Sequence, residues 1–211
     1  MSEDISLKKW DDFFHWHPAT KAVRNRKTYF KDLLKEQLKS RKENQPFNVL
    51  NIASGPCRDV LEFFEEEQPK DLFFDCVEAD LNAILHATRI NYQHLPKITF
   101  HKKNIFRFKT DKQYDLIWSA GLFDYFNDKM FTKLIANIAP YVKPGGEIVI
   151  GNFADTNPTL GYMEVFLGWY LHHRSKSHLK ELATNACGTS IKRLTVEQEP
   201  EGVNLFIRIQ L

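Results

Sequence analysis

Residues 49–57, VLNIASGPC, constrain the fold of this chain more than any other stretch. The apolar residues Val49, Leu50 and Ile52 predict a buried strand that runs directly into a turn of small residues. The run RDVLEFFEE that follows predicts a helix. A small-residue turn lets a ligand approach the backbone closely, and the first N–H groups of the new helix point into the same space. The stretch therefore predicts a ligand site at the carboxyl end of a strand in an open α/β sheet.

The rest of the chain alternates strands and helices with short links. Helices are expected over 19–43, 57–67, 80–95, 126–142 and 158–186, and strands over 47–52, 71–79, 97–104, 114–119 and 147–153. Two last strands, 190–199 and 203–211, are joined by so short a link that they should pair as an antiparallel hairpin. The predicted fold class is α/β: a Rossmann-like sheet of seven mostly parallel strands, with helices on both faces and this hairpin at its C-terminus.

Composition limits the partners that this chain can have. Its 211 residues are enough for one domain with a substantial core, and a formal net charge of +2 lacks the basic excess of a nucleic-acid-binding domain. Three distant cysteines without a CxxC pair predict neither disulfides nor a zinc site, so we expect a reducing, cytoplasmic setting and no metal. The first residues lack the apolar core of a signal peptide, and no apolar run of about 18 residues predicts a membrane span.

Residues 1–46 are expected to form an N-terminal helical lid or cap on a domain over 47–211. Aromatic and histidine side chains crowd residues 10–17. They either pack over the domain as an amphipathic segment or close over the ligand crevice and exclude water from a reaction. The triplet RNR at 24–26 either holds a carboxylate or phosphate or is a solvated basic face.

Three features together resemble the class I S-adenosylmethionine-dependent methyltransferases: the loop at 51–57, the acid that ends the second strand, and the Pro-Gly-Gly turn at 144–146. The resemblance covers residues 47–153 and the terminal hairpin, which this family uses as its sixth and seventh strands. It implies S-adenosylmethionine as the cofactor. The loop departs from the family pattern, since Asn51 replaces an acid and two of three glycines are Ala53 and Cys57. The turn is still small, so the resemblance implies that the methionine end is held by Asn51, Ala53, Ser54, Gly55 and Cys57.

Other strand ends should complete the cofactor site. A carboxylate after the second strand can accept hydrogen bonds from both ribose hydroxyls. The family pattern gives this role to Glu78 rather than Asp80, which is better placed to cap the next helix. An amide after the third strand would meet adenine, and small residues after the fourth leave space for the methyl group. The residues implied at these places are Glu78, Ala79 and Asp80, then Asn104 and Ile105, then Ser119, Ala120 and Gly121.

A narrower resemblance rests on the segments HPATKAVRNR, ASGPCRDV, SAGLFDYF and GNFADTNPTLGYMEVFLGWYLHHR. These segments are similar to bacterial methyltransferases of the extracellular-factor type, which are associated with methyl esters of 3-hydroxy fatty acids. The resemblance implies O-methylation of a small carboxylic acid. A carboxyl group with a pKa of about 4 is already a nucleophile at neutral pH. Positioning and desolvation would then supply most of the rate, without a strong general base.

The acceptor should lie just past the fourth strand, which makes Asp124 and Tyr125 the predicted catalytic residues. An arginine such as Arg24 or Arg174 could bind a carboxylate through two parallel hydrogen bonds. Aromatic side chains after residue 160 either wall an acyl or aromatic pocket or pack in the core. The predicted substrate-binding residues are Arg24, Tyr125, Asn152, Tyr162, Trp169 and Arg174.

Other functions stay open on the sequence alone. N-methylation of a small amine would need a base, for which Asp124, Tyr125 and His172 are candidates. The irregular loop also fits a non-catalytic protein that binds S-adenosylmethionine. A missing G-x-G-x-x-G argues against a dehydrogenase, and a missing Asp/Asn-Pro-Pro-Tyr/Phe motif argues against a DNA or protein-glutamine target. We expect a small-molecule substrate, no nucleic-acid partner and a possible homodimer.

Overall fold

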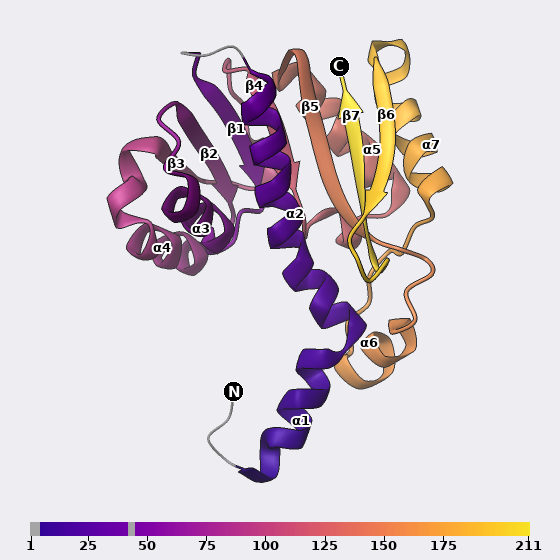
Figure 1. The fold of residues 1–211 in the computed structure, drawn as a ribbon. Helices are drawn as coiled ribbons and strands as arrows, with labels where there is room; N and C mark the ends of the chain where they lie inside the picture. Colours follow the sequence, from indigo (N-terminus) through magenta and orange to yellow (C-terminus); the bar gives the residue numbers. More distant parts are fainter. Residues whose placement is uncertain (1–4, 42–44) are drawn as a thin grey trace.

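A seven-stranded sheet in the order β3-β2-β1-β4-β5-β7-β6 forms the centre of the computed structural model, which describes residues 5–41 and 45–211 (Figure 1). The strands are β1 Phe47–Ile52, β2 Leu72–Glu78, β3 Ile98–Lys102, β4 Tyr114–Ser119, β5 Val142–Phe153, β6 Arg193–Gln198 and β7 Asn204–Gln210. The first five are parallel, and β7 pairs antiparallel with both β5 and β6. The predicted fold class is confirmed.

Helices cover both faces of the sheet because its strands are apolar on both sides. They are α1 Ile5–Trp16, α2 Pro18–Ser40, α3 Arg58–Glu67, α4 Leu81–Ile90, α5 Asp128–Ile138, α6 Leu160–Leu167 and α7 Lys176–Cys187. On one face α2 and α3 pack against Val49, Phe74 and Trp118. On the other face α5 and α7 pack against Leu50 and Ile150. Successive strand residues such as Val49 and Leu50 thus serve opposite layers of the core.

The second half of α2 belongs to the core of the domain. Phe30, Leu33 and Leu34 are buried against the sheet, and the Tyr29 ring stacks on Phe206 with 3.7 Å between ring centroids. The first half of α2 continues past the carboxyl ends of the strands, and α1 extends farther from the sheet beside α6 (Figure 1). In the described part of the chain, no helix has the length and apolar character needed to cross a bilayer.

Several predicted boundaries differ from the structure. The helical region over 158–186 is two helices, because Gly168 adopts a φ of 58° and ends α6. The Pro-Gly-Gly segment at 144–146 lies inside β5, where the register with β4 shifts. A Cβ on Gly146 would lie 2.9 Å from the Asp115 carbonyl oxygen, so glycine is required there. The helix expected over 80–95 ends at Ile90, and the last positions of the helix expected over 19–43 lie outside the described residues.

Candidate active site

The turn after β1 has the backbone conformation of a glycine-rich loop, although Gly55 is its only glycine. The φ angles of Ala53, Gly55 and Cys57 are 52°, 53° and 50°. These are the three positions at which the family pattern has glycine. A left-handed conformation costs a residue with a Cβ roughly 1–2 kcal/mol. Such strain persists only where the surrounding structure holds the backbone in place, and it gathers at ligand sites.

Two buried polar atoms of this turn lack a hydrogen-bond partner among the described residues: Nδ2 of Asn51 and Oγ of Ser54. Asn51 is only 2% exposed, and its neighbours in the sheet are Cys76 and Trp118. An unpaired buried polar group costs about 1–3 kcal/mol and calls for an explanation such as a bound ligand. The amide donor and the hydroxyl fit a ligand that offers a carboxylate, as the methionine end of S-adenosylmethionine does.

Glu78 ends β2 and joins it to this turn. Its Oε2 accepts a hydrogen bond from the Gly55 N–H at 2.9 Å, and its Oε1 accepts from the N–H groups of Ala79 and Asp80 at 2.7 and 3.0 Å. A carboxylate has about four lone-pair positions, so three are filled and one is left for a ribose hydroxyl. Asp80 caps α4 by accepting from the Asn82 N–H at 2.8 Å, as predicted.

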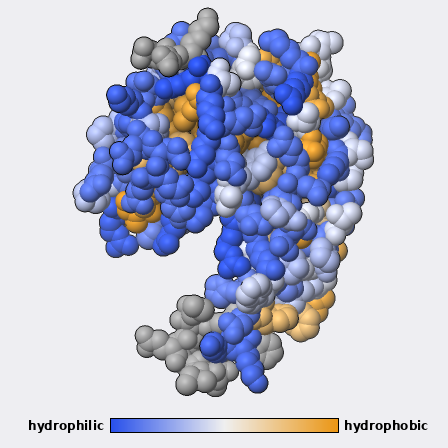
Figure 2. Space-filling model, viewed as in Figure 1, coloured by the Kyte–Doolittle hydropathy of each residue, from blue (hydrophilic) through white to orange (hydrophobic). Residues whose placement is uncertain are grey.

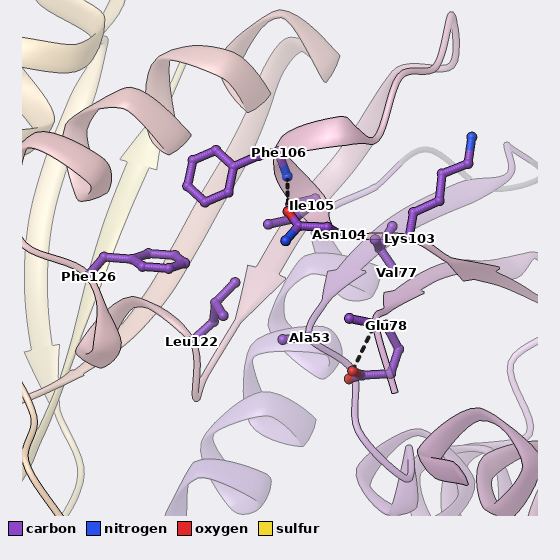
Figure 3. Close-up of a pocket in the computed structure, with 10 residues that line it drawn as sticks. Ala53, Val77, Glu78, Lys103, Asn104, Ile105, Phe106, Leu122 and Phe126 are labelled. Carbon is purple, nitrogen blue, oxygen red and sulfur yellow. Dashed lines mark hydrogen bonds between the residues drawn. The ribbon is translucent and has the colours of Figure 1, made fainter. Parts of the chain in front are cut away.

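A cavity of about 190 Å³ opens at the carboxyl ends of β1, β2, β3 and β4 (Figure 3). Its lining residues are Ala53, Val77, Glu78, Ala79, Lys103, Asn104, Ile105, Phe106, Leu122 and Phe126. Five predicted cofactor residues therefore meet in one place. Oδ1 of Asn104 accepts from the Phe106 N–H at 2.9 Å, which leaves its amide NH₂ for a ligand. Apolar walls with one carboxylate and one amide fit an adenosine group. Sequence reasoning missed the walls Phe106, Leu122 and Phe126.

At the end of β4 the three predicted small residues differ in role. Ser119 is 1% exposed, and its hydroxyl donates to the Ile52 carbonyl oxygen at 3.1 Å. The Ser119 side chain therefore links β4 to β1, and its predicted place beside the cofactor, as a small residue that leaves space, stays a prediction. Ala120 is half-buried and Gly121 is exposed. A Cβ on Gly121 would lie 3.4 Å from Nη1 of Arg26, so this corner faces an arginine that comes from α2.

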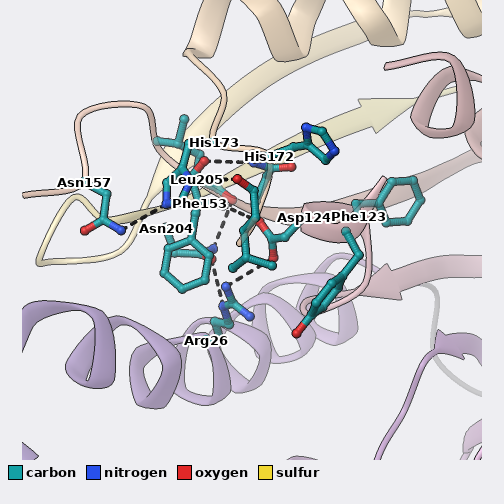
Figure 4. A network of polar contacts seen from close by, with 12 residues as sticks. Arg26, Phe123, Asp124, Phe153, Asn157, His172, His173, Asn204 and Leu205 are labelled. Carbon is teal, nitrogen blue, oxygen red and sulfur yellow. Dashed lines mark hydrogen bonds and ion pairs between the residues drawn. The ribbon is translucent and has the colours of Figure 1, made fainter. Parts of the chain in front are cut away.

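Asp124 follows β4 and is buried, with 1% of its surface exposed (Figure 4). Its Oδ1 accepts from the Phe153 N–H at 2.6 Å, and its Oδ2 lies 3.5 Å from Nη2 of Arg26. Burial raises the pKa of Asp124, and the Arg26 charge is the largest opposing influence on that pKa. Both oxygens of Asp124 are engaged, one by the Phe153 N–H and one by Arg26, which suits a role in positioning Arg26; the catalytic role of Asp124 stays a prediction. Tyr125 is 54% exposed, and its hydroxyl oxygen accepts from Trp169 Nε1 at 3.0 Å.

Arg26 is the residue of this corner that sequence reasoning did not select. Its Nε donates to Oδ1 of Asn204 at 2.8 Å, and its guanidinium lies 4.6 Å from the centre of the Phe153 ring (Figure 4). Nη1, which faces Gly121, has no partner among the described residues. Burial lowers the pKa of Arg26, and the Asp124 carboxylate opposes this effect. The only signal in the sequence was the RNR triplet at 24–26.

Three predicted substrate residues have structural roles or lie elsewhere. Arg174 is 1% exposed, and its Nε and Nη2 bind Oδ1 of Asp128 at 3.1 and 3.0 Å. Its Nη1 donates to Oδ1 of Asn152 at 2.8 Å, and Asn152 is itself buried. Both residues anchor the segment after α6 to β5, so their assignment to substrate binding is corrected. Arg24 is exposed on α2 and bonds Nδ1 of His15 at 3.0 Å, away from the corner at Gly121.

A second cavity, of about 210 Å³, lies between α2 and α6. Its lining is mostly apolar and consists of His17, Ala19, Thr20, Val23, Tyr162, Met163, Leu167 and Trp169. Tyr162 and Trp169 are predicted substrate residues. The Trp169 ring contacts the edge of Phe153, with 5.8 Å between centroids, and Phe153 also lies under Arg26. The apolar cavity and the Arg26 guanidinium therefore flank the same ring.

Comparison with known proteins agrees with this architecture. Residues 49–146 match a family model described as a methyltransferase domain. A possible exported protein from Bordetella parapertussis has a TM-score of 0.77 at 20% identity, over 94% of this chain and 71% of that chain. The N-methyltransferase NodS from Bradyrhizobium japonicum WM9, in complex with S-adenosylhomocysteine, has a TM-score of 0.61 at 19% identity, over 93% and 89%.

Magnesium protoporphyrin IX methyltransferase from Synechocystis PCC 6803, with bound S-adenosylmethionine, has a TM-score of 0.65 at 10% identity, over 98% and 91% of the two chains. The chain spans about half the length of several other similar methyltransferase structures. No curated protein matches it. The methyltransferase model covers the chain from β1 into β5, and β6 and β7 add the antiparallel hairpin that completes the sheet. The chain therefore contains a region similar to a methyltransferase domain and has the fold of the class I S-adenosylmethionine-dependent methyltransferases.

Proposed function

We propose that this methyltransferase acts on a small carboxylic acid and converts it to a methyl ester. The observation that carries the proposal is the Arg26 guanidinium at the end of β4, with Nη1 directed to Gly121 and unpaired among the described residues. A planar guanidinium suits a carboxylate, which it can bind through two parallel hydrogen bonds. Asn204 and Asp124 hold the other side of the guanidinium and so orient it.

Methyl transfer to a carboxylate requires the protein mainly to position the two reactants and to exclude water. When bound, S-adenosylmethionine supplies an electrophilic methyl group whose sulfonium keeps the electron pair as the bond to carbon breaks. An ionised carboxylate has no proton to lose, so no general base is needed. Arg26 would orient one carboxylate for attack, and Phe153 and Trp169 would exclude water from it. Asp124, already engaged with Arg26 and the Phe153 N–H, is suited to positioning Arg26 rather than to moving a proton.

The cavity between α2 and α6 supports an acid with an apolar body. It begins at Trp169, next to the Phe153 ring that Arg26 covers, and continues along Val23 and Leu167. A carboxylate at Arg26 would therefore have an apolar space beside it. This arrangement agrees with the resemblance to methyltransferases of the extracellular-factor type, and a 3-hydroxy fatty acid is accordingly a substrate to test.

Residues 1–46 are part of the same proposal. They would act as a cap, because α2 carries Arg26 to the corner at Gly121 and also lines the apolar cavity.

A cytoplasmic setting is supported by the free cysteines, of which Cys57 and Cys76 lie with their sulfur atoms 3.7 Å apart. A second candidate is small-molecule N-methylation, which the exposed Tyr125 favours, since a base that takes an amine proton must reach the substrate.

The test combines product analysis with one conservative variant. Purified protein is given S-adenosylmethionine with a panel of fatty and aryl carboxylic acids and a matched panel of amines, and products are identified by mass spectrometry. Arg26→Lys keeps a charge beside Asp124 but removes the planar fork. We expect methyl esters from the wild type, and kcat/KM about 10- to 150-fold lower in the variant, the scale of a charged hydrogen bond.

Arg89→Lys, on the exposed part of α4, is the matched control and should behave as the wild type. Affinity for S-adenosylhomocysteine should be the same in all three proteins, because Arg26 does not line the cofactor cavity. Methylated amines with no esters would refute the proposal in favour of N-methylation. No product from either panel, despite tight cofactor binding, would favour a non-catalytic protein that binds the cofactor.

A further inference from the structure

The apolar cavity between α2 and α6 extends from Arg26 along one side of α2. Ala19, Val23 and Arg26 follow one another at spacings of four and three residues, so their side chains lie on the same side of the helix. Ala19 and Val23 line the cavity, and Arg26 covers the Phe153 ring, whose edge Trp169 contacts. On the opposite wall, α6 supplies hydrophobic residues that reach the surface (Figure 2). One face of α2 therefore carries both the guanidinium and the apolar wall beside it.

Three rings lie at the far end of the cavity, toward the start of α2, and we call Phe13, His17 and Tyr162 the aromatic cluster. The His17 and Tyr162 rings both line the cavity, with 4.4 Å between their centroids. The Phe13 ring lies 5.7 Å from each of them. Burial lowers the pKa of His17, so its imidazole is uncharged at neutral pH. The far end of the cavity is therefore bounded by uncharged rings, and Ala19 beside it is only 5% exposed.

The length and the volume of this space indicate the same size of ligand. Ala19 and Arg26 are seven residues apart on α2. This separation is about 10 Å along a helix axis, which is the extended length of a chain of about eight carbon atoms. The cavity volume is about 210 Å³. An apolar cavity of about 150 Å³ holds one benzene molecule, so this cavity has room in proportion for about eight carbon atoms.

We propose that the cavity selects carboxylic acids by length and holds an apolar body of about eight carbon atoms between Arg26 and the aromatic cluster. The inference rests on the proposed esterification, because that reaction places the carboxylate at Arg26. Each carbon up to this length leaves water against Val23 and Trp169, and carbons beyond the aromatic cluster stay in water. The expected substrates are thus medium-chain and monocyclic aryl acids, since longer chains gain no further contact with the protein.

The experiment measures kcat/KM for methyl-ester formation with saturated acids from butanoic to hexadecanoic acid. We expect kcat/KM to rise about four-fold for each added carbon, the effect of burying one methylene group, and to stop rising near octanoic acid. Leucine is larger than alanine by about three carbon atoms, so Ala19→Leu should move this break to about pentanoic acid. Tyr162→Ala removes a ring from the aromatic cluster and should move the break beyond decanoic acid.

Leu85→Ala is the matched control, because Leu85 on α4 is 59% exposed and lines neither cavity. It should reproduce the wild-type profile. Butanoic acid is too short to reach Ala19, so its kcat/KM should be the same in all variants. Circular dichroism will verify folding, and Tyr162→Ala tests the inference even if Ala19→Leu does not fold.

The possible outcomes separate the length limit from the reaction itself. Ester formation that keeps rising up to hexadecanoic acid would overturn the length limit and leave the esterification standing. A break near octanoic acid that Tyr162→Ala does not move would do the same. If no acid in the series gave an ester, the esterification and the length limit would both be wrong.

Discussion

Replacing Arg26 by methionine should lower the free energy of unfolding by about 3–5 kcal/mol, the usual loss when one partner of a buried ion pair is removed. The Asp124 side chain is 2% exposed and that of Arg26 12%, so water cannot solvate the Asp124 carboxylate once the Arg26 charge is gone. Asp124 would retain one hydrogen bond, from the Phe153 N–H at 2.6 Å. The Arg26 partner Asn204 would also lose its donor.

The double variant Arg26→Met with Asp124→Asn separates this pair from ordinary packing. Asparagine can still accept from the Phe153 N–H, and no buried charge is left, so the double variant should be more stable than Arg26→Met alone. The coupling energy should be about 2 kcal/mol, well above the 0.3–0.5 kcal/mol within which independent sites add. Urea unfolding followed by circular dichroism measures all four proteins. Additive losses would refute the electrostatic reasoning.

The pH dependence gives a second test of the same pair. Burial raises the pKa of Asp124, and Arg26 restrains that rise. A carboxyl group with a raised folded pKa stabilises the protein at low pH and loses this contribution as pH rises through the folded pKa. Without Arg26 the pKa of Asp124 rises further. The loss in free energy of unfolding of Arg26→Met, relative to the wild type, should therefore become smaller as the pH is lowered. A stability loss of Arg26→Met that becomes larger at low pH would contradict this prediction.

Three further predictions concern the turn after β1 and its surroundings. Glu78→Gln should weaken S-adenosylhomocysteine binding about 10- to 150-fold in calorimetric titration, since Glu78 holds Gly55 and has one lone pair left for ribose; an unchanged Kd would exclude that role. Ala53→Gly should raise the free energy of unfolding by up to about 1 kcal/mol, because it relieves a φ of 52°. Ala83→Gly inside α4 is the control, and it should lower the free energy of unfolding by about 0.5–1 kcal/mol. If Ala53→Gly lowered the free energy of unfolding as well, the backbone at Ala53 would not be strained. Burial raises the pKa of Asp59 from 3.8 to about 6, so the wild type should lose about 3 kcal/mol relative to Asp59→Asn between about pH 4 and pH 8. Parallel stability curves for these two proteins would mean that Asp59 titrates normally.

Local features allowed the sequence alone to determine the fold class and to predict which strand ends meet at one cavity. Strand and helix periods are properties of a few neighbouring residues, and a short link such as that at 200–202 leaves β6 and β7 only one way to pair. The carboxyl ends of parallel strands meet at one edge, and Ala53, Glu78 and Asn104 line one cavity there although they are far apart in the chain.

The arrangement around Arg26 and Gly121 depended on tertiary structure, because burial and charge pairing involve residues that are distant in sequence. Arg24 and Arg26 are the same residue type and lie only two positions apart on α2. Two positions along a helix separate the directions of two side chains by about 200° around the helix axis, however. Only the packing of α2 decides that Arg26 faces Gly121 and that Arg24 meets His15. Arg174 is likewise occupied by Asp128, 46 residues earlier in the chain. Residue type therefore indicated which chemistry was available, and long-range packing decided which side chains could reach a substrate.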